Sequence, residues 1–237
     1  KKNMTMNRIK ESAIIALGII VLGFCIKSGI NDFTNKDRKV TVKGLAEKEV
    51  EADKVTWAIQ TSEQGNDLPT LYNKINATTD KVKTFLKQNG VKEEEMSVGA
   101  PQVTDLDADR YNTNKRTYRY NTSSTVTVTS RNVKLMRNII SRQGELLKQG
   151  VAVVNSGYYN SVKYEYVSFQ DMKPKMMQEA IKNAEKTAEQ FAENSNSKLN
   201  KILTADQGQF SIDDRDENTP HIKKLRVVTT VTYSLKD

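Results

Sequence analysis

The sequence predicts an α+β fold in which mostly antiparallel strands pack against about three helices. Several stretches alternate apolar and polar residues at every second position, which is typical of strands with one buried face. Other stretches repeat apolar residues at three- and four-residue spacing, as amphipathic helices do. With 237 residues, 37% of them hydrophobic and 28% charged, the chain is long enough to bury a core of its own. The expected order of elements is β-β-α-β-β-α-β-α-β-β.

The first two expected strands lie on either side of a short acidic connection. Val40 and Val42 alternate with polar neighbours, while Val55, Trp57 and Ile59 share one face of the second strand. The connection, at about residues 51–53, is short enough for a hairpin, so the two strands are expected to pair. Trp57 is expected in the core, because its neighbours on the same face are apolar.

A helix follows over residues 67–89, with Asp67 as its N-cap and Gly90 as its stop. Then come a strand at about 95–104, a polar loop over 105–116 and a long strand over 117–130.

The second half of the chain repeats this alternation of helices and strands. The expected elements are a helix at 132–148, a strand at 162–169, a helix at 172–195 and strands near 199–212 and 222–235. The last helix is expected to bury the apolar stripe Met177, Ile181, Ala184, Ala188 and Phe191.

The amino-terminal segment is predicted to be a membrane anchor. Residues 12–26 carry no charge, and Arg8, Lys10 and Lys27 flank them. This run spans about 22 Å as a helix, short of the roughly 30 Å hydrocarbon core, but extension to Ile30 with a snorkelling Lys27 makes residues 12–30 a feasible anchor. The positive charges ahead of the run favour a cytoplasmic amino terminus.

These features predict a signal anchor at residues 1–30, a linker at 31–37 and one domain at 38–237. The anchor would lie in the cell inner membrane, with the domain facing the periplasm. Two alternatives remain: cleavage of the segment to give a periplasmic protein, and lipidation at Cys25. No A-x-A-like triplet follows the run, and the bulky Phe24 precedes Cys25, so neither alternative has its usual signal.

Composition argues against several classes of function. The net charge is +8, but half of the excess lies in the first 27 residues and the other charges alternate in sign, so no nucleic-acid binding is expected. One Cys and one His are too few for the usual zinc site, a disulfide framework or an Fe–S cluster. No glycine-rich nucleotide-binding motif occurs. The sequence therefore predicts no cofactor and no metal.

Three groups of residues carry weak signals for chemistry. His221 is the only imidazole, but no G-x-S-x-G turn offers it a nucleophile. Asp105, Asp107 and Asp109 form the D-x-D-x-D pattern that opens a calcium-binding loop. The next residue is Arg110, where such loops have Gly. A dense acidic stretch could in principle supply paired carboxylates; it consists of Asp213, Asp214, Asp216 and Glu217. A surface role is expected for all three groups.

Tyrosines form the more promising pattern, since two pairs lie at two-residue spacing on two expected strands. These possible interface residues are Tyr118, Tyr120, Tyr164 and Tyr166. Tyr supplies contact area at low entropic cost and keeps a hydroxyl group for water, which suits a protein interface. A half-buried sheet face beneath a helix is the alternative interpretation.

The order of these elements resembles the SIMPL domain. The resemblance begins with VTVKGLAEKEVEADKVTWAIQTSEQ (residues 40–64) and continues through TYRYNTSSTVTVTSRNVKLMRNII (117–140), AIKNAEKTAEQFA (180–192) and VVTTVTYSL (227–235). The chain departs from the family pattern at Glu51-Ala52-Asp53, where Pro-Asp is common, and in its longer 105–116 loop. The resemblance implies an envelope protein of poorly defined activity; one periplasmic immunogenic group forms ring-like oligomers, and some relatives are linked to stress tolerance.

The resulting hypothesis is a non-catalytic, membrane-anchored envelope protein that acts as a homo-oligomer or binds an unidentified envelope partner, with a possible role in stress tolerance. The alternatives are a periplasmic small-ligand binder with a Tyr-lined pocket and a hydrolase of unknown type.

Overall fold

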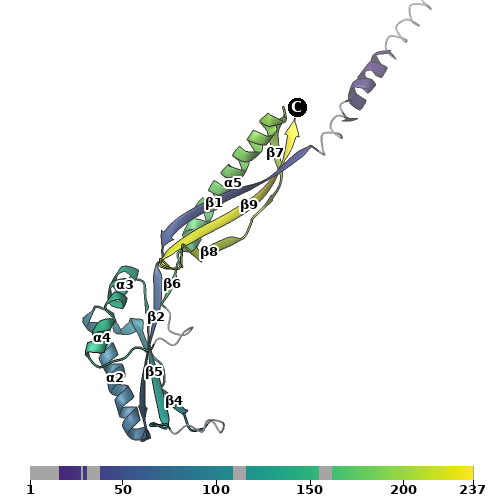
Figure 1. Cartoon of the computed structure of the whole chain (residues 1–237). Helices are drawn as coiled ribbons and strands as arrows, with labels where there is room; N and C mark the ends of the chain where they lie inside the picture. The colour runs from purple at the N-terminus through teal and green to yellow at the C-terminus, as the bar shows by residue number, and fades with distance from the viewer. Residues whose placement is uncertain (1–15, 28, 31–37, 109–115, 155–161, 237) are drawn as a thin grey trace, which may run out of the picture. The chain divides into compact units, whose positions relative to one another are not determined.

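The computed structural model describes residues 16–27, 29–30, 38–108, 116–154 and 162–236 (Figure 1). The chain divides into two compact units, each with its own sheet. Unit 1 comprises Lys1–Glu47, Lys173–Ser211 and Arg226–Asp237, and unit 2 comprises Lys48–Met172 and Ile212–Leu225. Some strands therefore begin in one unit and end in the other.

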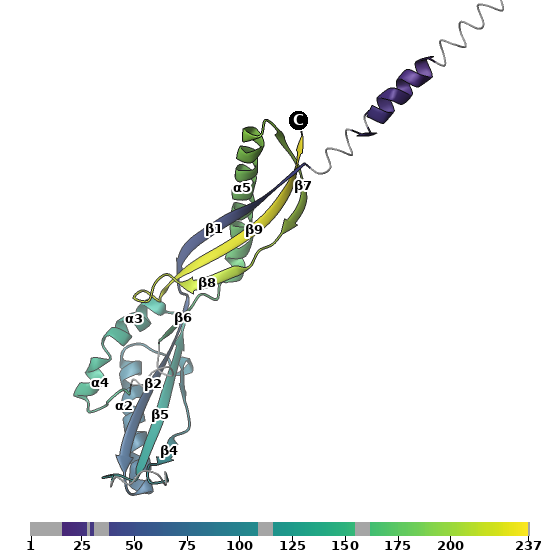
Figure 2. The ribbon, with the colours of Figure 1, turned by 45° about the vertical axis from the view of Figure 1, so that its right-hand side comes forward.

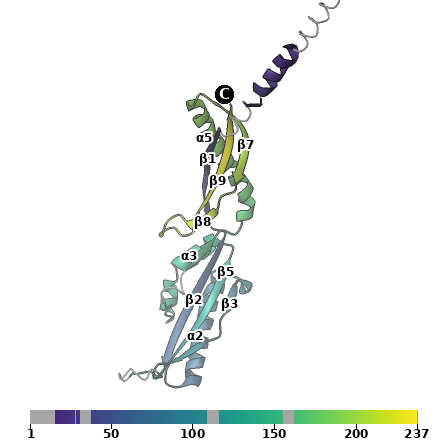
Figure 3. The same ribbon diagram turned by 90° about the vertical axis from the view of Figure 1, so that its right-hand side faces the viewer.

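Unit 2 is built on a five-stranded antiparallel sheet with two long central strands. β2 (Lys54–Gly65) pairs with β5 (Tyr120–Ser130) over eleven positions, with Trp57 opposite Val128. Two short strands, β3 (Met96–Val98) and β4 (Gln102–Asp105), pair one after the other with the far side of β5, and Figure 3 shows β3 there. β6 (Lys163–Glu165) pairs with the start of β2.

Helices cover one face of this sheet and supply a core of large side chains. They are α2 (Leu68–Gln88), α3 (Val133–Ser141) and α4 (Gly144–Lys148), with a 3-10 turn at Glu93–Glu95, and Figure 1 shows the three helices on one side of β2 and β5. The core contains Val55, Trp57, Ile59, Val82, Phe85, Leu86, Val91, Val126, Val128, Met136, Ile139, Leu146 and Val151.

Unit 1 is built on a four-stranded sheet whose long strands are β1 (Lys39–Glu51) and β9 (Ile222–Lys236). β7 (Lys198–Asp206) and β8 (Phe210–Asp214) both pair with the other side of β9, which therefore runs between β1 and β7 (Figure 2). The helix α5 (Phe169–Asn194) packs on this sheet.

α5 approaches β1 very closely, because small residues line the contact. A stripe at four-residue spacing is buried along α5: Met176, Ala180, Ala184, Ala188 and Ala192. A Cβ atom at Gly44 of β1 would lie 1.9 Å from the carbonyl oxygen of Ala180, far inside contact distance. The backbone of α5 can therefore reach the strand only where that strand has no side chain.

Several expectations from the sequence are confirmed. The fold is α+β with two antiparallel sheets, as predicted. The helix α2 begins where expected, because the Asp67 carboxylate accepts a hydrogen bond from the Thr70 backbone N–H at 3.0 Å. Gly90 follows the helix at a φ of 92°, a conformation that favours glycine. Trp57 is fully buried in the core.

The predicted hairpin between the first two strands is wrong. β1 pairs with β9, and β2 pairs with β5 and β6, so the two strands belong to different sheets. The chain leaves one sheet at Glu51 and enters the other at Lys54. A short connection is necessary for a hairpin, but it does not determine the partner of either strand.

Five other expectations need correction, one of them the strand expected near 199–212, which is divided into β7 and β8. The helix expected at 132–148 is divided into α3 and α4, and the strand expected at 162–169 ends at Glu165, because α5 already begins at Phe169. The strand expected at 95–104 is interrupted at Gly99–Pro101. α5 buries its small stripe instead of Phe191, which is exposed, because the close approach to Gly44 admits only small side chains.

Residues 16–27 are helical, and each of them is exposed. Within the described residues, no helix has the length and apolar character needed to cross a membrane. Residues 12–15 of the expected anchor and the linker at 31–37 lie outside the described part of the chain.

Candidate functional site

In the calcium-loop pattern at residues 105–109, the first carboxylate already forms an ion pair with an arginine. The Asp105 carboxylate accepts hydrogen bonds from Nε and Nη2 of Arg119, the latter at 2.9 Å, and from the Asp107 backbone N–H at 3.0 Å. These contacts hold the pKa of Asp105 below its usual range, the Arg119 bond being the main cause. Asp109 lies outside the described residues. Among those that are described, no three His, Cys, Asp or Glu side chains form a group able to hold a metal ion.

The acidic stretch at residues 213–217 begins with the last two residues of β8 and continues into the turn ahead of β9. Asp216 accepts hydrogen bonds from the Thr219 hydroxyl, the Arg215 guanidinium and the backbone N–H groups of Asn218 and Thr219, and these lower its pKa to about 2. Asp214 forms an ion pair with Lys223. Because these two carboxylates are bonded to different residues, they do not form a pair that shares a proton.

His221 is half-buried just before β9. Its carbonyl oxygen accepts a hydrogen bond from the Ala52 N–H at 2.8 Å, and its ring meets the Tyr164 ring edge to face with centroids 6.0 Å apart. Burial and, next, the charge of Arg137 lower the pKa of His221. The imidazole is therefore neutral at pH 7, and the residues that line a pocket with it, Glu51, Val133, Lys134 and Arg137, offer no hydroxyl or thiol group.

The two tyrosine pairs lie at opposite ends of the unit 2 sheet. Tyr164 is opposite Val55 and Tyr120 is opposite Gly65, which are ten positions apart along β2, or about 33 Å. Tyr164 packs partly against the core, which raises its pKa by burial, whereas Tyr118 is 45% exposed. The pairs are therefore two separate surfaces.

The middle of the open face of the unit 2 sheet, away from the helices, is polar and carries no charged side chain from Thr56 to Ser62 of β2 or from Ser123 to Thr129 of β5. Its side chains are Thr56, Ala58, Gln60, Ser62, Ser123, Thr125, Thr127 and Thr129. Such a face has little apolar area to bury and no charge to select a partner.

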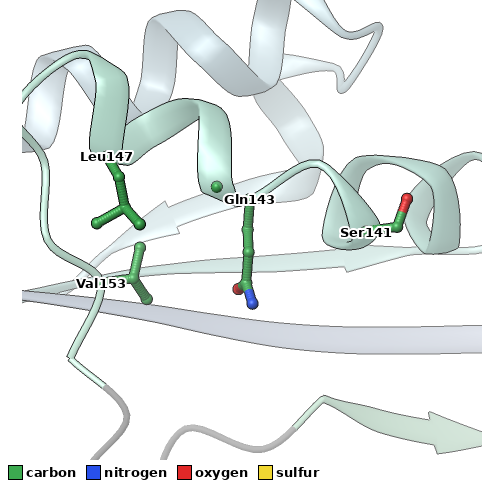
Figure 4. Close-up of a pocket in the computed structure, with 5 residues that line it drawn as sticks. Ser141, Gln143, Leu147 and Val153 are labelled. Carbon is green, nitrogen blue, oxygen red and sulfur yellow. The ribbon is translucent and has the colours of Figure 1, made fainter.

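A cavity of about 310 Å³ lies between α3, α4 and Val153 (Figure 4). Leu147 and Val153 line it together with Ser141, Gln143 and Gly144, and the close-up shows the first two side chains near each other. No titratable side chain lines this cavity, so the described lining offers no acid, base or nucleophile for catalysis.

The unit 1 sheet has two edge strands, β1 and β7, and the β7 edge exposes large apolar side chains. β7 pairs with β9 on one side, and all of its last seven residues, Asn200–Asp206, are exposed. Ile202 lies opposite Tyr233 of β9, yet Ile202 is 50% exposed while Tyr233, under α5, is 3% exposed. The helix therefore covers β9 but leaves β7 uncovered, and Leu203 beside Ile202 is exposed as well.

The corresponding edge of the unit 2 sheet is protected by its shape. β3 and β4 have three and four residues and are separated by Gly99, Ala100 and Pro101. Short strands and proline are the usual means of preventing edge-to-edge pairing. β7 has nine residues without proline, and therefore lacks this protection.

The fold described above, two antiparallel sheets each backed by helices, defines an α+β protein without a recognisable catalytic centre in its described residues. The comparison with family models places it further. Residues 40–233 match the model of the SIMPL family, described as "Protein of unknown function (DUF541)", and the chain belongs to this family. The resemblance seen in the sequence is thereby confirmed. No curated protein matches the chain closely.

Proposed function

We propose that this chain is a non-catalytic SIMPL-domain protein that acts by association, and that the β7 edge is where two copies meet. The supporting observation is the nine-residue strand with its outer side unpaired among the described residues and with Ile202 and Leu203 exposed. An uncovered strand of this kind is a template for a further strand, whose main-chain hydrogen bonds give affinity.

The residues of β7 favour a second copy as the partner. In an antiparallel pairing about a two-fold axis at Ile202, Lys198 of one copy lies opposite Asp206 of the other, and Leu199 lies opposite Ala205. Neither Lys198 nor Asp206 forms an ion pair with another described residue. The pairing therefore gives each charge a partner and brings apolar side chains together at the centre.

Irregularities in β7 limit how far such pairing extends. Its register against β9 shifts between Leu199 and Ile202 and again between Ile202 and Thr204. Such bulges bend a strand and increase its twist. The edge therefore suits one closed contact between two copies better than an open stack of many.

The proposal also places the protein at a membrane. The apolar residues 12–30 would anchor it in the inner membrane, with the domain in the periplasm, and a role in stress tolerance would follow the family resemblance. The exposed side chains of Leu17, Ile19, Ile20 and Phe24 support the anchor, because a helix with exposed apolar side chains on all sides requires an apolar environment.

The first test compares two charged substitutions at corresponding edges. The full chain in mild detergent is studied by sedimentation over a range of concentrations. Ile202→Lys is expected to shift the dimer dissociation constant at least tenfold upward, because a lysine would be buried at the centre of the contact. The matched control, Val103→Lys, changes an equally exposed residue on β4 and is expected to leave the constant unchanged. A monomeric wild type at all concentrations contradicts the proposal.

The second test checks the register by exchanging charges. Lys198→Asp and Asp206→Lys each place like charges opposite one another and are expected to weaken the dimer several-fold. The double variant restores opposite charges and is expected to recover most of the affinity. If the two single effects simply add in the double variant, the register centred on Ile202 is wrong.

A further inference from the structure

A small basic pocket lies in unit 2, away from β7. It has a volume of about 220 Å³ and is lined by Glu51, Val133, Lys134, Arg137 and His221. These residues come from the end of β1, the first turns of α3 and the residue preceding β9. Three of the five side chains are potential hydrogen-bond donors, so the pocket is suited to a ligand that accepts hydrogen bonds.

The two cations of this pocket have no partner among the described residues. Lys134 and Arg137 are three positions apart on α3, and therefore project from the same side of the helix. Neither forms an ion pair or side-chain hydrogen bond with another described residue. The first turn of α3 carries no acidic residue, although a helix amino terminus favours negative charge. Two positive charges thus meet here, and Glu51 is the one acidic side chain among the residues that line the pocket.

His221 is a further polar residue of the lining, and its ring meets the Tyr164 ring edge to face with centroids 6.0 Å apart. Burial and, next, the positive charge of Arg137 lower the pKa of His221. Glu51 and Asp216 act on His221 in the opposite direction, and Arg215 acts with Arg137. Burial and Arg137 together keep the imidazole neutral, so it can donate one hydrogen bond and accept another.

The balance of charges selects the ligand class. Lys134 and Arg137 contribute two positive charges and Glu51 contributes one negative charge, which leaves one net positive charge for a neutral His221. A single carboxylate matches this net charge and the forked geometry of Arg137. A dianion such as phosphate would be repelled by Glu51, whereas a hydroxyl or amino group on the ligand could donate a hydrogen bond to it.

From this geometry we propose that the pocket binds a small monocarboxylate carrying a hydroxyl or amino group next to its carboxylate. Arg137 and Lys134 hold the carboxylate, Glu51 accepts a hydrogen bond from the neighbouring group, and His221 closes the pocket. This site is independent of the β7 contact, and either proposal can fail without the other.

The single histidine of the chain makes the test direct. The Cε1–H resonance of His221 is followed by NMR while sodium lactate, sodium acetate or inorganic phosphate is added to the full chain at constant ionic strength. Lactate is expected to give a saturable shift at millimolar concentration. Acetate, which lacks the hydroxyl group, and phosphate are each expected to bind at least fivefold more weakly.

Variants on α3 and β1 distinguish specific binding from a surface effect. Arg137→Gln is expected to weaken lactate binding at least tenfold and Arg137→Lys to have an intermediate effect, whereas Lys148→Gln on α4 leaves binding unchanged. Glu51→Gln is expected to reduce the preference for lactate over phosphate. A shift equal to that caused by sodium chloride, or unchanged lactate binding in Arg137→Gln, overturns the proposal. Overall spectra verify that each variant is folded.

Discussion

The two units share a strand plan. In unit 2, α2 lies over β2 and β5, and the short strands β3 and β4 flank β5. In unit 1, α5 lies over β1 and β9, and β7 and β8 flank β9. Each sheet thus has two long paired strands and a helix that lies over them. Two consecutive shorter strands form one outer edge of each sheet. The order of these elements along the chain is the same in both units, and so is their order in the sheet, apart from β6 at the other edge of the unit 2 sheet. The two units differ in how their helices meet the sheet.

The contact beneath the helix is filled in opposite ways. Unit 2 fills it with bulky side chains such as Trp57, Phe85 and Leu86, and adds α3 and α4 around them. Unit 1 fills it with alanines against Gly44, so the helix lies close and covers a narrow strip. A sheet with the same strand plan is therefore well covered in one unit and leaves β7 uncovered in the other.

The largest expected effect is a cavity in unit 2. Phe85→Ala removes a fully buried ring from the core and is expected to lower the free energy of unfolding by about 4 kcal/mol. Urea denaturation measures this loss, and the full chain should show it in the transition of unit 2. The exposed Phe191 of unit 1 provides the control, because Phe191→Ala should change stability little. Equal losses at both positions would contradict the assigned burial.

Adding a side chain at the close contact between α5 and β1 is expected to destabilise unit 1. Gly44→Ala adds a methyl group 1.9 Å from the Ala180 carbonyl oxygen and should cost about 3 kcal/mol, because α5 must move away from β1. Gly144→Ala, where the added group meets nothing within 4 Å, is the matched control in unit 2. Thermal unfolding followed by circular dichroism compares them; a neutral Gly44→Ala would mean that α5 is not held closely against β1.

Asp53 provides a pH-dependent test of unit 2. Its carboxylate accepts hydrogen bonds from the backbone N–H groups of Val167 at 2.7 Å and Ser168 at 2.8 Å. Burial raises the pKa of Asp53, but hydrogen bonds from Ser168 and Val167 and the charge of Arg131 outweigh it, so the pKa is lowered in the folded state. Asp53→Asn is expected to cost about 2 kcal/mol at pH 7.

The sign of the pH effect follows from the lowered pKa. The stabilisation by ionised Asp53 is present above its unfolded pKa, near 4, and is lost as the pH falls through the lower folded pKa. The difference in stability between wild type and Asp53→Asn should therefore narrow below about pH 4. Urea denaturation at pH 7, 5, 4 and 3 measures this difference, and a constant gap would show that the charge is not involved.

The smallest expected effect is on the folding of β7 itself. Ile202→Lys is expected to change the stability of the monomer by less than about 0.5 kcal/mol, because the side chain is already exposed. Denaturation at a concentration well below the dimer dissociation constant tests this. A large loss would indicate that Ile202 belongs to the core and would remove the basis for the edge contact.

Periodicity predicted the elements of the fold better than their pairing. The alternation in β2 and the cap at Asp67 are local features, and both are confirmed. The partner of β1 is not a local property, since β9 lies at the other end of the chain. The buried face of α5 was predicted in part: Ala184 and Ala188 are buried as expected, whereas Phe191 is exposed. The predicted stripe missed Ala180, whose carbonyl oxygen lies against Gly44 of β1.

The candidate sites depend still more on tertiary structure. Ile202 and Leu203 look like ordinary buried strand residues in the sequence, and only the narrow coverage by α5 leaves them exposed. His221 was recognised as the only imidazole, but its neighbours Arg137 and Lys134 are distant in sequence and had no motif to mark them. Two cations at the start of a predicted helix were the one available signal.

The position of β9 in unit 1 has a consequence for biosynthesis. This strand is central, pairing with β1, β7 and β8, yet it follows all of them along the chain. During synthesis or export, β1 and α5 therefore have no β9 to pack or pair with until residues 222–236 emerge. In unit 2, β5 emerges much earlier and can pair at once with β2, β3 and β4. A ribosome stalled before residue 222 would carry all strands of the unit 2 sheet and an unfinished unit 1 sheet, and chaperones or proteases acting in that interval would meet unit 1 first.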